Sequence, residues 1–141
     1  MLALKKAIYG KLSGSALDAH IAGRLFDTGV PEGGSEYPYG VYFIVYNSPE
    51  YPGGKTIEQF MVQFSLFSAT PGDSTEVEGM LADLWTLYDD VVFTITGYKP
   101  IYFIRGNLME TMEDHSTLTT PSGTRSVYHY SQEYDGWIVK D

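Results

Sequence analysis

The stretch GRLFDTGVPEGGSEYPYGVYFIVY, residues 23–46, decides the fold of this chain. Its first part is rich in glycine and proline, which favour turns, so residues 24–38 are predicted to form a loop. Its last part, residues 39–46, is predicted to form a strand in which apolar side chains point to both faces. A strand with two apolar faces needs two covers. Either the domain itself supplies both, or a neighbouring subunit supplies the second.

Two helices are predicted before this loop. Residues 2–12 carry an apolar side chain at every fourth position, which gives one narrow apolar stripe on a helix. Ser15 is a suitable N-cap for a short second helix over residues 16–22, which Gly23 would end.

A long strand is predicted after the loop. Residues 47–55, NSPEYPGGK, contain two prolines and two glycines and indicate a projecting hairpin loop. Residues 56–68 alternate in character, and their predicted core face consists of Phe60, Val62, Phe64 and Leu66. At about 3.3 Å per residue this strand would be roughly 43 Å long, more than twice a typical strand. It must therefore bend or extend beyond its own core.

A third helix is predicted to cover that core face. Asp73 is the expected N-cap, and Glu76 three residues later completes a capping-box arrangement. The apolar residues that follow on one helical face are Val77, Leu81, Leu84 and Tyr88. Asp89 and Asp90 oppose the helix dipole, so the helix is expected to end there.

The C-terminal part is predicted to be β structure. Residues 91–96 form a short strand or an extended link, and residues 101–113 and 125–134 form two long strands. The polar connector at residues 114–124 indicates a flexible hairpin tip, and residues 137–139 indicate a short edge strand.

Together these elements predict one α+β domain over residues 1–141, with an antiparallel or mixed sheet of about four long strands and helices packed on one face. The other face would carry Tyr42, Tyr46 and Phe67, which makes it too aromatic for a monomer in water. A subunit partner is therefore expected on that face.

Composition excludes several classes of protein. The chain has 18 acidic and nine basic residues, and because the basic residues are scattered it lacks the cationic footprint of a nucleic-acid-binding protein. The net charge of −9 serves solubility, or a surface past which DNA moves without sticking. There is no cysteine for a disulfide, a thiolate zinc site or a nucleophile. The N-terminus is not patterned as a signal peptide, and no apolar run approaches the roughly 18 residues of a membrane helix.

No catalytic, metal or cofactor site is predicted. The three histidines, His20, His115 and His129, are far apart in sequence and lack the i+3 or i+4 partner of a metal motif. The acidic run at residues 110–115 could bind a divalent cation, but a solvated strand end is the preferred interpretation. A nucleophile elbow, a Walker A sequence and a dinucleotide fingerprint are all missing. The chain is therefore predicted not to be an enzyme.

A row of tyrosines on the last long strand has two interpretations. Tyr128, Tyr130 and Tyr134 are ordinary strand formers in a half-exposed row. They would also suit a subunit interface, where tyrosine supplies contact area with few rotatable bonds.

Several of these residues resemble a known family. The motif GRLFD at residues 23–27, Pro31 and Gly33 in the loop, and YPY at residues 37–39 are similar to the tail-terminator and tail-completion proteins of tailed phages and prophage-like elements. The long strand QFMVQFSLFS and the helix EVEGMLADLW resemble the next elements of that family.

The resemblance implies a structural role in a virion. Members of the family form a hexameric ring that caps the tail tube, ends its polymerisation and joins it to the head through the neck. The implied partners are other copies of the chain, the tail tube protein and a head-completion or neck protein, with no membrane. DNA would pass through the ring without specific binding. The implied location is the tail or neck of the virion, after synthesis in the host cytoplasm.

Two other functions stay open at this point. One is a head-closure, neck or minor tail protein of similar size. The other is a small hydrolase or ligand-binding domain with a pocket between the sheet and the third helix.

The residues expected to contact other subunits or partners lie on the open sheet face, in the loop at residues 47–55 and in the tip at residues 114–124. They are Tyr42, Tyr46, Glu50, Tyr51, Lys55, Phe67, Thr119, Ser122, Tyr128, Tyr130 and Tyr134.

Overall fold

A computed structural model describes residues 2–50, 52–54, 56–69, 74–89, 91–92, 94–120 and 123–140 of the chain. The helices α1 (Leu2–Leu12) and α2 (Ala16–Ile21) come first and are followed by the strands β1 (Leu25–Asp27), β2 (Tyr39–Glu50) and β3 (Ile57–Ser68). A short 3-10 turn (η1, Pro52–Gly54) lies between β2 and β3. Helix α3 (Thr75–Tyr88) and the strands β4 (Tyr98–Thr120) and β5 (Gly123–Lys140) complete the fold.

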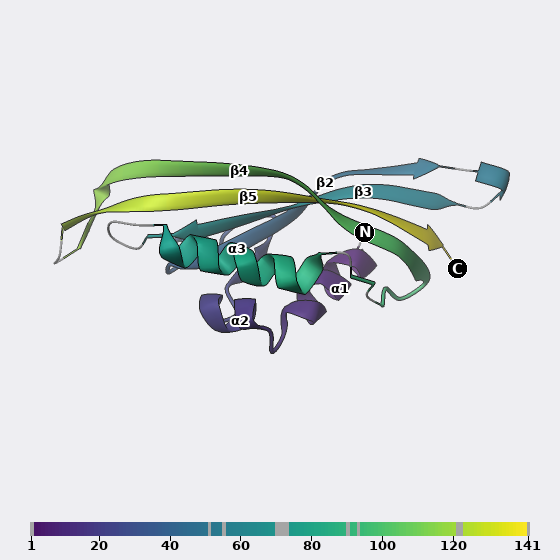
Figure 1. Ribbon diagram of the computed structural model, residues 1–141, viewed down its shortest axis with the longest axis horizontal. Coiled ribbons are helices and arrows are strands. Elements are labelled where there is room, and N and C mark those ends of the chain that lie inside the picture. The colour runs from purple at the N-terminus through teal and green to yellow at the C-terminus, as the bar shows by residue number, and fades with distance from the viewer. Residues whose placement is uncertain are drawn as a thin grey trace.

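The strands form one mixed sheet in the order β1-β2-β3-β5-β4. Strand β1 is parallel to β2, and the other neighbouring strands are antiparallel. The helices α1, α2 and α3 all lie on one face of this sheet (Figure 1). The predicted α+β class, with four long strands and helices on one face, is confirmed. The short strand β1 adds a fifth strand at one edge.

Strand β1 lies inside the segment that was predicted to be a loop. Arg24 holds the two ends of this segment together: its Nε donates to the carbonyl of Pro38 at 3.1 Å, and its Nη2 donates to the carbonyl of Tyr37 at 3.4 Å. The backbone N–H of Gly40 donates in return to the carbonyl of Arg24 at 2.8 Å. These contacts place residues 25–27 beside the start of β2, so the loop prediction is wrong for those residues.

The two N-terminal helices form as the sequence predicts. The apolar stripe of α1, namely Leu4, Ile8 and Leu12, is buried. The hydroxyl of Ser15 accepts a hydrogen bond from the backbone N–H of Asp18 at 3.1 Å, which is the predicted N-cap of α2. After α2 the backbone of Gly23 has φ 74°, a left-handed conformation that favours glycine after a helix.

Helix α3 packs on the predicted core face of β3. The residues Phe60, Val62, Phe64 and Leu66 are each no more than 1% exposed. The predicted apolar residues of α3, namely Val77, Leu81, Leu84 and Tyr88, are buried in the same cluster. The predicted core is therefore confirmed.

The start of α3 differs from the prediction. Its N-cap residue is Ser74, whose side chain makes no capping hydrogen bond, and Asp73 lies outside the described residues. The carboxylate of Glu76 instead accepts a hydrogen bond of 2.6 Å from the hydroxyl of Ser68 at the end of β3. Glu76 thus joins α3 to the sheet, and the N-cap residue of α3 is Ser74 where Asp73 was expected.

Both hairpins are longer than predicted. Residues 47–50 pair with residues 57–60 and belong to β2, so they are not a loop. Strand β4 continues to residue 120, so most of the tip predicted at residues 114–124 is strand. Residues 137–139 continue β5, which lies between β3 and β4 and is not an edge strand. Figure 1 shows the two hairpins extending from opposite ends of the sheet.

Candidate interaction surfaces

Three of the tyrosines predicted to make contacts are buried in the core. Tyr42, Tyr130 and Tyr134 are 3%, 5% and 0% exposed, respectively. Tyr42 pairs in register with the core residue Phe64, and Tyr134 pairs with Val62, so these side chains point toward the helices. The prediction that they lie on an open or half-exposed face is wrong. The apolar character of both faces of β2 concealed which face the helices cover.

The buried tyrosines connect the helical layer to the sheet. The hydroxyl of Tyr134 donates to Oδ1 of Asp89 at 2.6 Å, and that of Tyr88 donates to the carbonyl of Ile8 at 2.7 Å. The hydroxyl of Tyr42 makes a long hydrogen bond of 3.5 Å to the carbonyl of Lys5. Burial raises the pKa of Tyr42 to about 12 and also raises the pKa of Tyr88 and of Tyr134. These hydroxyls therefore stay protonated and donate at neutral pH.

The open face of the sheet, opposite the helices, carries an aromatic ladder (Phe26, Tyr39, Phe67 and His129). The ring of Phe67 stacks on that of Tyr39 with 4.7 Å between centroids, and on that of His129 with 4.2 Å. Phe26 continues the row at 6.2 Å from Tyr39. Phe67 thus lies on the predicted face, half-buried between its two neighbours. Its role as a contact residue stays a prediction.

Polar side chains beside the ladder are bonded to one another. The hydroxyl of Ser131 lies 3.0 Å from Nε2 of His129 and 3.3 Å from the hydroxyl of Ser65. The amide of Gln63 donates to the same Ser65 hydroxyl at 3.3 Å. This part of the open face therefore satisfies its polar groups within the single chain.

The β2–β3 hairpin exposes two of the predicted contact residues. Tyr46 and Glu50 are both exposed on β2. The hydroxyl of Tyr46 accepts a hydrogen bond of 3.3 Å from the amide of Gln59 on β3. Both residues are accessible to a partner.

The structure describes only two of the other predicted contact residues, Thr119 and Tyr128. Tyr51, Lys55 and Ser122 are outside the described residues. Thr119 pairs with Thr124 near the tip of the β4–β5 hairpin. Tyr128 is half-buried against the core cluster.

Strand β4 carries an exposed apolar surface that was not predicted from the sequence. Its side chains Ile104, Leu108, Met109 and Met112 are 36% to 68% exposed. Strand β4 ends the sheet, and an apolar edge strand of this kind is a template for association. The sequence signal was LMETM at residues 108–112, because apolar residues at positions 108, 109 and 112 of a strand cannot all face one core.

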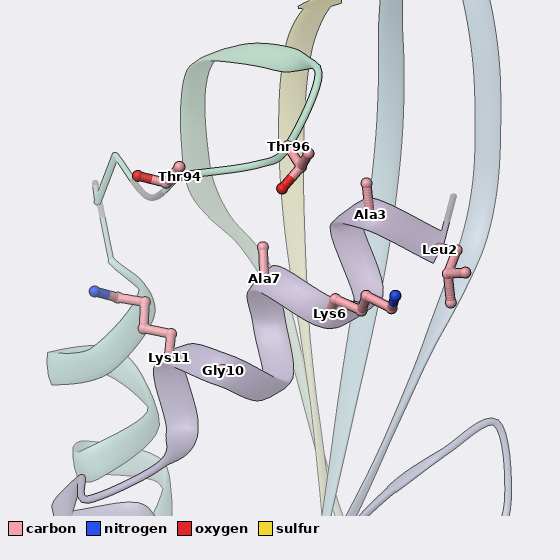
Figure 2. Close-up of a pocket in the computed structure, with 8 residues that line it drawn as sticks. All are labelled: Leu2, Ala3, Lys6, Ala7, Gly10, Lys11, Thr94 and Thr96. Atoms are coloured by element: carbon pink, nitrogen blue, oxygen red, sulfur yellow. The ribbon is translucent and has the colours of Figure 1, made fainter.

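A groove of about 670 Å³ lies along α1. It is lined by Leu2, Ala3, Lys6, Ala7, Gly10 and Lys11 of α1 and by Thr94 and Thr96 of the segment before β4. Figure 2 shows Ala3 and Ala7 pointing from α1 toward the two threonines. This α1 groove is not the pocket predicted between the sheet and α3. There the rings of Phe64, Tyr88 and Tyr134 fill the space, with centroids 4.8 to 6.2 Å apart.

The α1 groove has a basic rim in an acidic protein. Helix α1 contains three lysines and no carboxylate. The ammonium of Lys5 lies 2.9 Å from Oδ1 of Asp27, and its hydrogen bond to that carboxylate lowers the pKa of Asp27. Lys6 and Lys11 have no ion-pair partner within the part of the chain that the structure describes. Among the described residues, two cations without an ion-pair partner therefore stand beside an apolar floor.

The described residues show no arrangement for metal chemistry. Among them there is no group of three or more His, Asp or Glu side chains that could hold a metal ion. His20 has one carboxylate partner, because its Nδ1 lies 2.6 Å from Oδ2 of Asp83 and connects α2 to α3. None of the helices in the described ranges is long and apolar enough to cross a membrane.

The fold defines a class of protein: an α+β domain with a mixed sheet, helices on one face and two long hairpins. The structure is similar to a chain of a solved structure described as the virion of a native gene transfer agent (GTA) particle. The likeness has a TM-score of 0.71 and covers 96% of this chain and 94% of that chain, at 11% sequence identity. At this identity the likeness establishes a shared fold. No protein-family model matches the chain, and no curated protein matches it significantly.

Proposed function

We propose that this protein is a structural component of the virion of a phage-like particle, where it serves as the tail terminator. In this role it forms a ring, a hexamer in the family it resembles, that caps the tail tube, ends tail polymerisation and joins the tail to the head or neck. The observation that carries the proposal is the likeness to a virion chain over 96% of the sequence with a TM-score of 0.71.

The resemblance to the tail-terminator family supports the more specific role. Within the GRLFD motif, Leu25–Asp27 form β1 and Arg24 holds together the two ends of the loop before β2. The motif therefore stabilises the local structure in a way that depends on which residues it contains. An arginine at this position bonds two carbonyls, and the residues after it pair with β2.

The surfaces of the chain suit a ring subunit. A subunit of a closed ring needs two different surfaces, one for each neighbour, and the two hairpins project from opposite ends of the sheet (Figure 1). The net charge of −9 suits a channel through which DNA passes without being held. The tail tube protein and a head-completion or neck protein are the other partners of this proposal, and no catalytic step is part of it.

The proposal is tested by deleting the gene from the genetic element that carries it and imaging the particles by electron microscopy. We expect tails longer than normal and detached from heads, and restoration of both defects by the intact chain. Tails of normal length that lack heads would instead assign the protein to head closure or the neck. Normal tails joined to heads would refute a virion role at this junction.

A further inference from the structure

The α1 groove has the chemistry to bind a segment that is both apolar and acidic. Lys6 and Lys11, which lack an ion-pair partner among the described residues, stand on either side of an apolar floor that includes Ala3 and Ala7 (Figure 2). An occupant would complement both features if its apolar side chains packed on the floor and its carboxylates paired with the two lysines. The occupant must therefore carry these two kinds of side chain close together.

The β4 edge segment, which we define as residues 108–112, has this composition. Its exposed apolar side chains are Leu108, Met109 and Met112. Glu110 is exposed between them, and Glu113 and Asp114 follow in sequence, so residues 108–114 contain three carboxylates and no basic residue. Methionine side chains adapt to irregular grooves because they are unbranched and flexible.

Within one chain the β4 edge segment and the α1 groove lie at opposite ends of α3. Glu110 pairs in register with Tyr130, whose hydroxyl donates to Glu78 in the first turn of α3 at 3.4 Å. At the last turn of α3, the hydroxyl of Tyr88 donates to the carbonyl of Ile8 on α1 at 2.7 Å. The helix rises about 15 Å between these two contacts. The segment therefore does not occupy the groove of its own chain.

We propose that the β4 edge segment of one copy docks in the α1 groove of the next copy, with Leu108 and Met112 on the alanine floor and Glu110, which lies on the same face of β4, facing Lys6 and Lys11. The two surfaces differ, so the contact is heterologous and repeats from copy to copy until a ring closes. The inference rests on the proposed function, for which it specifies the interface between subunits.

Disulfide trapping tests this contact directly, because the chain contains no cysteine of its own. The double variant Ala7→Cys with Met112→Cys places one thiol on the groove floor and one on the face of the β4 edge segment that carries Glu110. The matched control is Ala7→Cys with Ala19→Cys, because Ala19 is exposed on α2 and belongs to neither surface. Under mild oxidation of the concentrated full chain we expect a ladder of covalent multimers that forms about tenfold faster than in the control, owing to the high effective concentration at a docked site.

Charge reversal provides a second measurement that does not depend on the cysteine variants. Lys6→Glu with Lys11→Glu should abolish self-association in sedimentation experiments, and mixing that variant with Glu110→Lys chains should restore mixed pairs. Circular dichroism of each variant checks that it folds. At about 1 mM even a contact with a dissociation constant of about 1 mM is half-formed. A chain that stays monomeric at this concentration would overturn the inference. Equal trapping in the Ala19 control would also overturn it.

The outcomes separate this inference from the proposed function. If microscopy finds a ring at the end of the tail tube but cysteines at positions 7 and 112 do not cross-link in those particles, the interface is wrong and the function stands. If the cross-link forms but deletion leaves tails and heads normal, the function is wrong and the interface stands.

Discussion

The indole Nε1 of Trp85 on α3 donates a hydrogen bond of 2.9 Å to Oε1 of Gln132 on β5. The amide nitrogen of the same glutamine donates to the carbonyls of Gly106 and Asn107, at 3.0 and 3.1 Å, where the register of β4 shifts. Gln132 is 1% exposed, so one buried side chain connects the covering helix to an irregularity in the edge strand. The guanidinium of Arg105 lies over the Trp85 ring, 4.2 Å from its centroid.

Replacing Gln132 with leucine should therefore destabilise the protein. The substitution keeps the volume but leaves the Trp85 N–H and the two bulge carbonyls without their partner, at a cost of about 2–4 kcal/mol. Urea unfolding measures the loss. The matched control is Gln63→Leu on the open face, which should cost less than about 1 kcal/mol because Gln63 is half-buried and bonds one serine. Equal losses would contradict the role assigned to Gln132.

Removing the ring of Phe64 should leave a cavity in the centre of the core. Phe64 is fully buried and packs on Tyr88 and Tyr134, so Phe64→Ala should cost about 3–5 kcal/mol. The control is Phe67→Ala, which removes a half-buried ring from the open face of the same strand and should cost about 1 kcal/mol. A Phe64→Ala loss below about 1 kcal/mol would show that the core lies on the other face.

The stability of the protein should fall at high pH. The pKa of Tyr42 is about 12 in the folded protein against an ordinary value of 10.0. Above pH 10 the unfolded chain loses this proton while the folded chain keeps it. Stability is therefore complete below pH 10 and falls toward pH 12, by about 1.4 kcal/mol per pH unit for this tyrosine. Tyr88 and Tyr134 act in the same direction.

Urea unfolding at several pH values checks this dependence. Tyr42→Phe should cost little at pH 7, because its hydrogen bond to Lys5 is long, but it should flatten the fall between pH 10 and pH 12. Identical slopes for the two proteins would show that Tyr42 is not the group responsible.

Gly136 is required where β5 passes the ring of Phe60. The two residues are paired across β3 and β5, and a methyl group at position 136 would overlap the Phe60 ring. Gly136→Ala should cost about 1–3 kcal/mol through overpacking. Thermal unfolding measures the effect, and Phe60→Leu should cost less in the Gly136→Ala background than alone, because the smaller side chain relieves the overlap.

A glycine in open space provides the control for this prediction. Gly10 lies in α1 with nothing near its missing Cβ, so Gly10→Ala should stabilise the protein by about 0.5–1 kcal/mol. If Gly10→Ala and Gly136→Ala changed the melting temperature alike, the overlap with Phe60 would not be the cause.

The sequence was informative wherever one physical pattern dominated. The alternation of residues 57–68 identified the core face of β3, and the spacing of Leu4, Ile8 and Leu12 identified the buried stripe of α1. The sequence pattern was misleading where a residue type, such as proline, occurs both in loops and on edge strands. Pro49 indicated a loop, but it lies in β2 beyond the end of β1, where an edge strand tolerates a missing N–H.

The surfaces were harder to predict than the core because they depend on tertiary contacts. Tyr42 was assigned to the open face because both faces of β2 are apolar, and only the position of the helices distinguishes them. The α1 groove exists because the segment with Thr94 and Thr96 passes beside α1, although these residues are more than 80 positions apart in sequence. No local pattern encodes such an approach.

The length of β5 has a mechanical consequence. Residues 128–139 of β5 pair with residues 57–68 of β3 without interruption, and β4 pairs along the other side. A pull along the β4–β5 hairpin would load these backbone hydrogen bonds in shear, so that many must break together, whereas peeling would break them one after another. The strand pairing is therefore expected to resist tension along the long axis of the sheet.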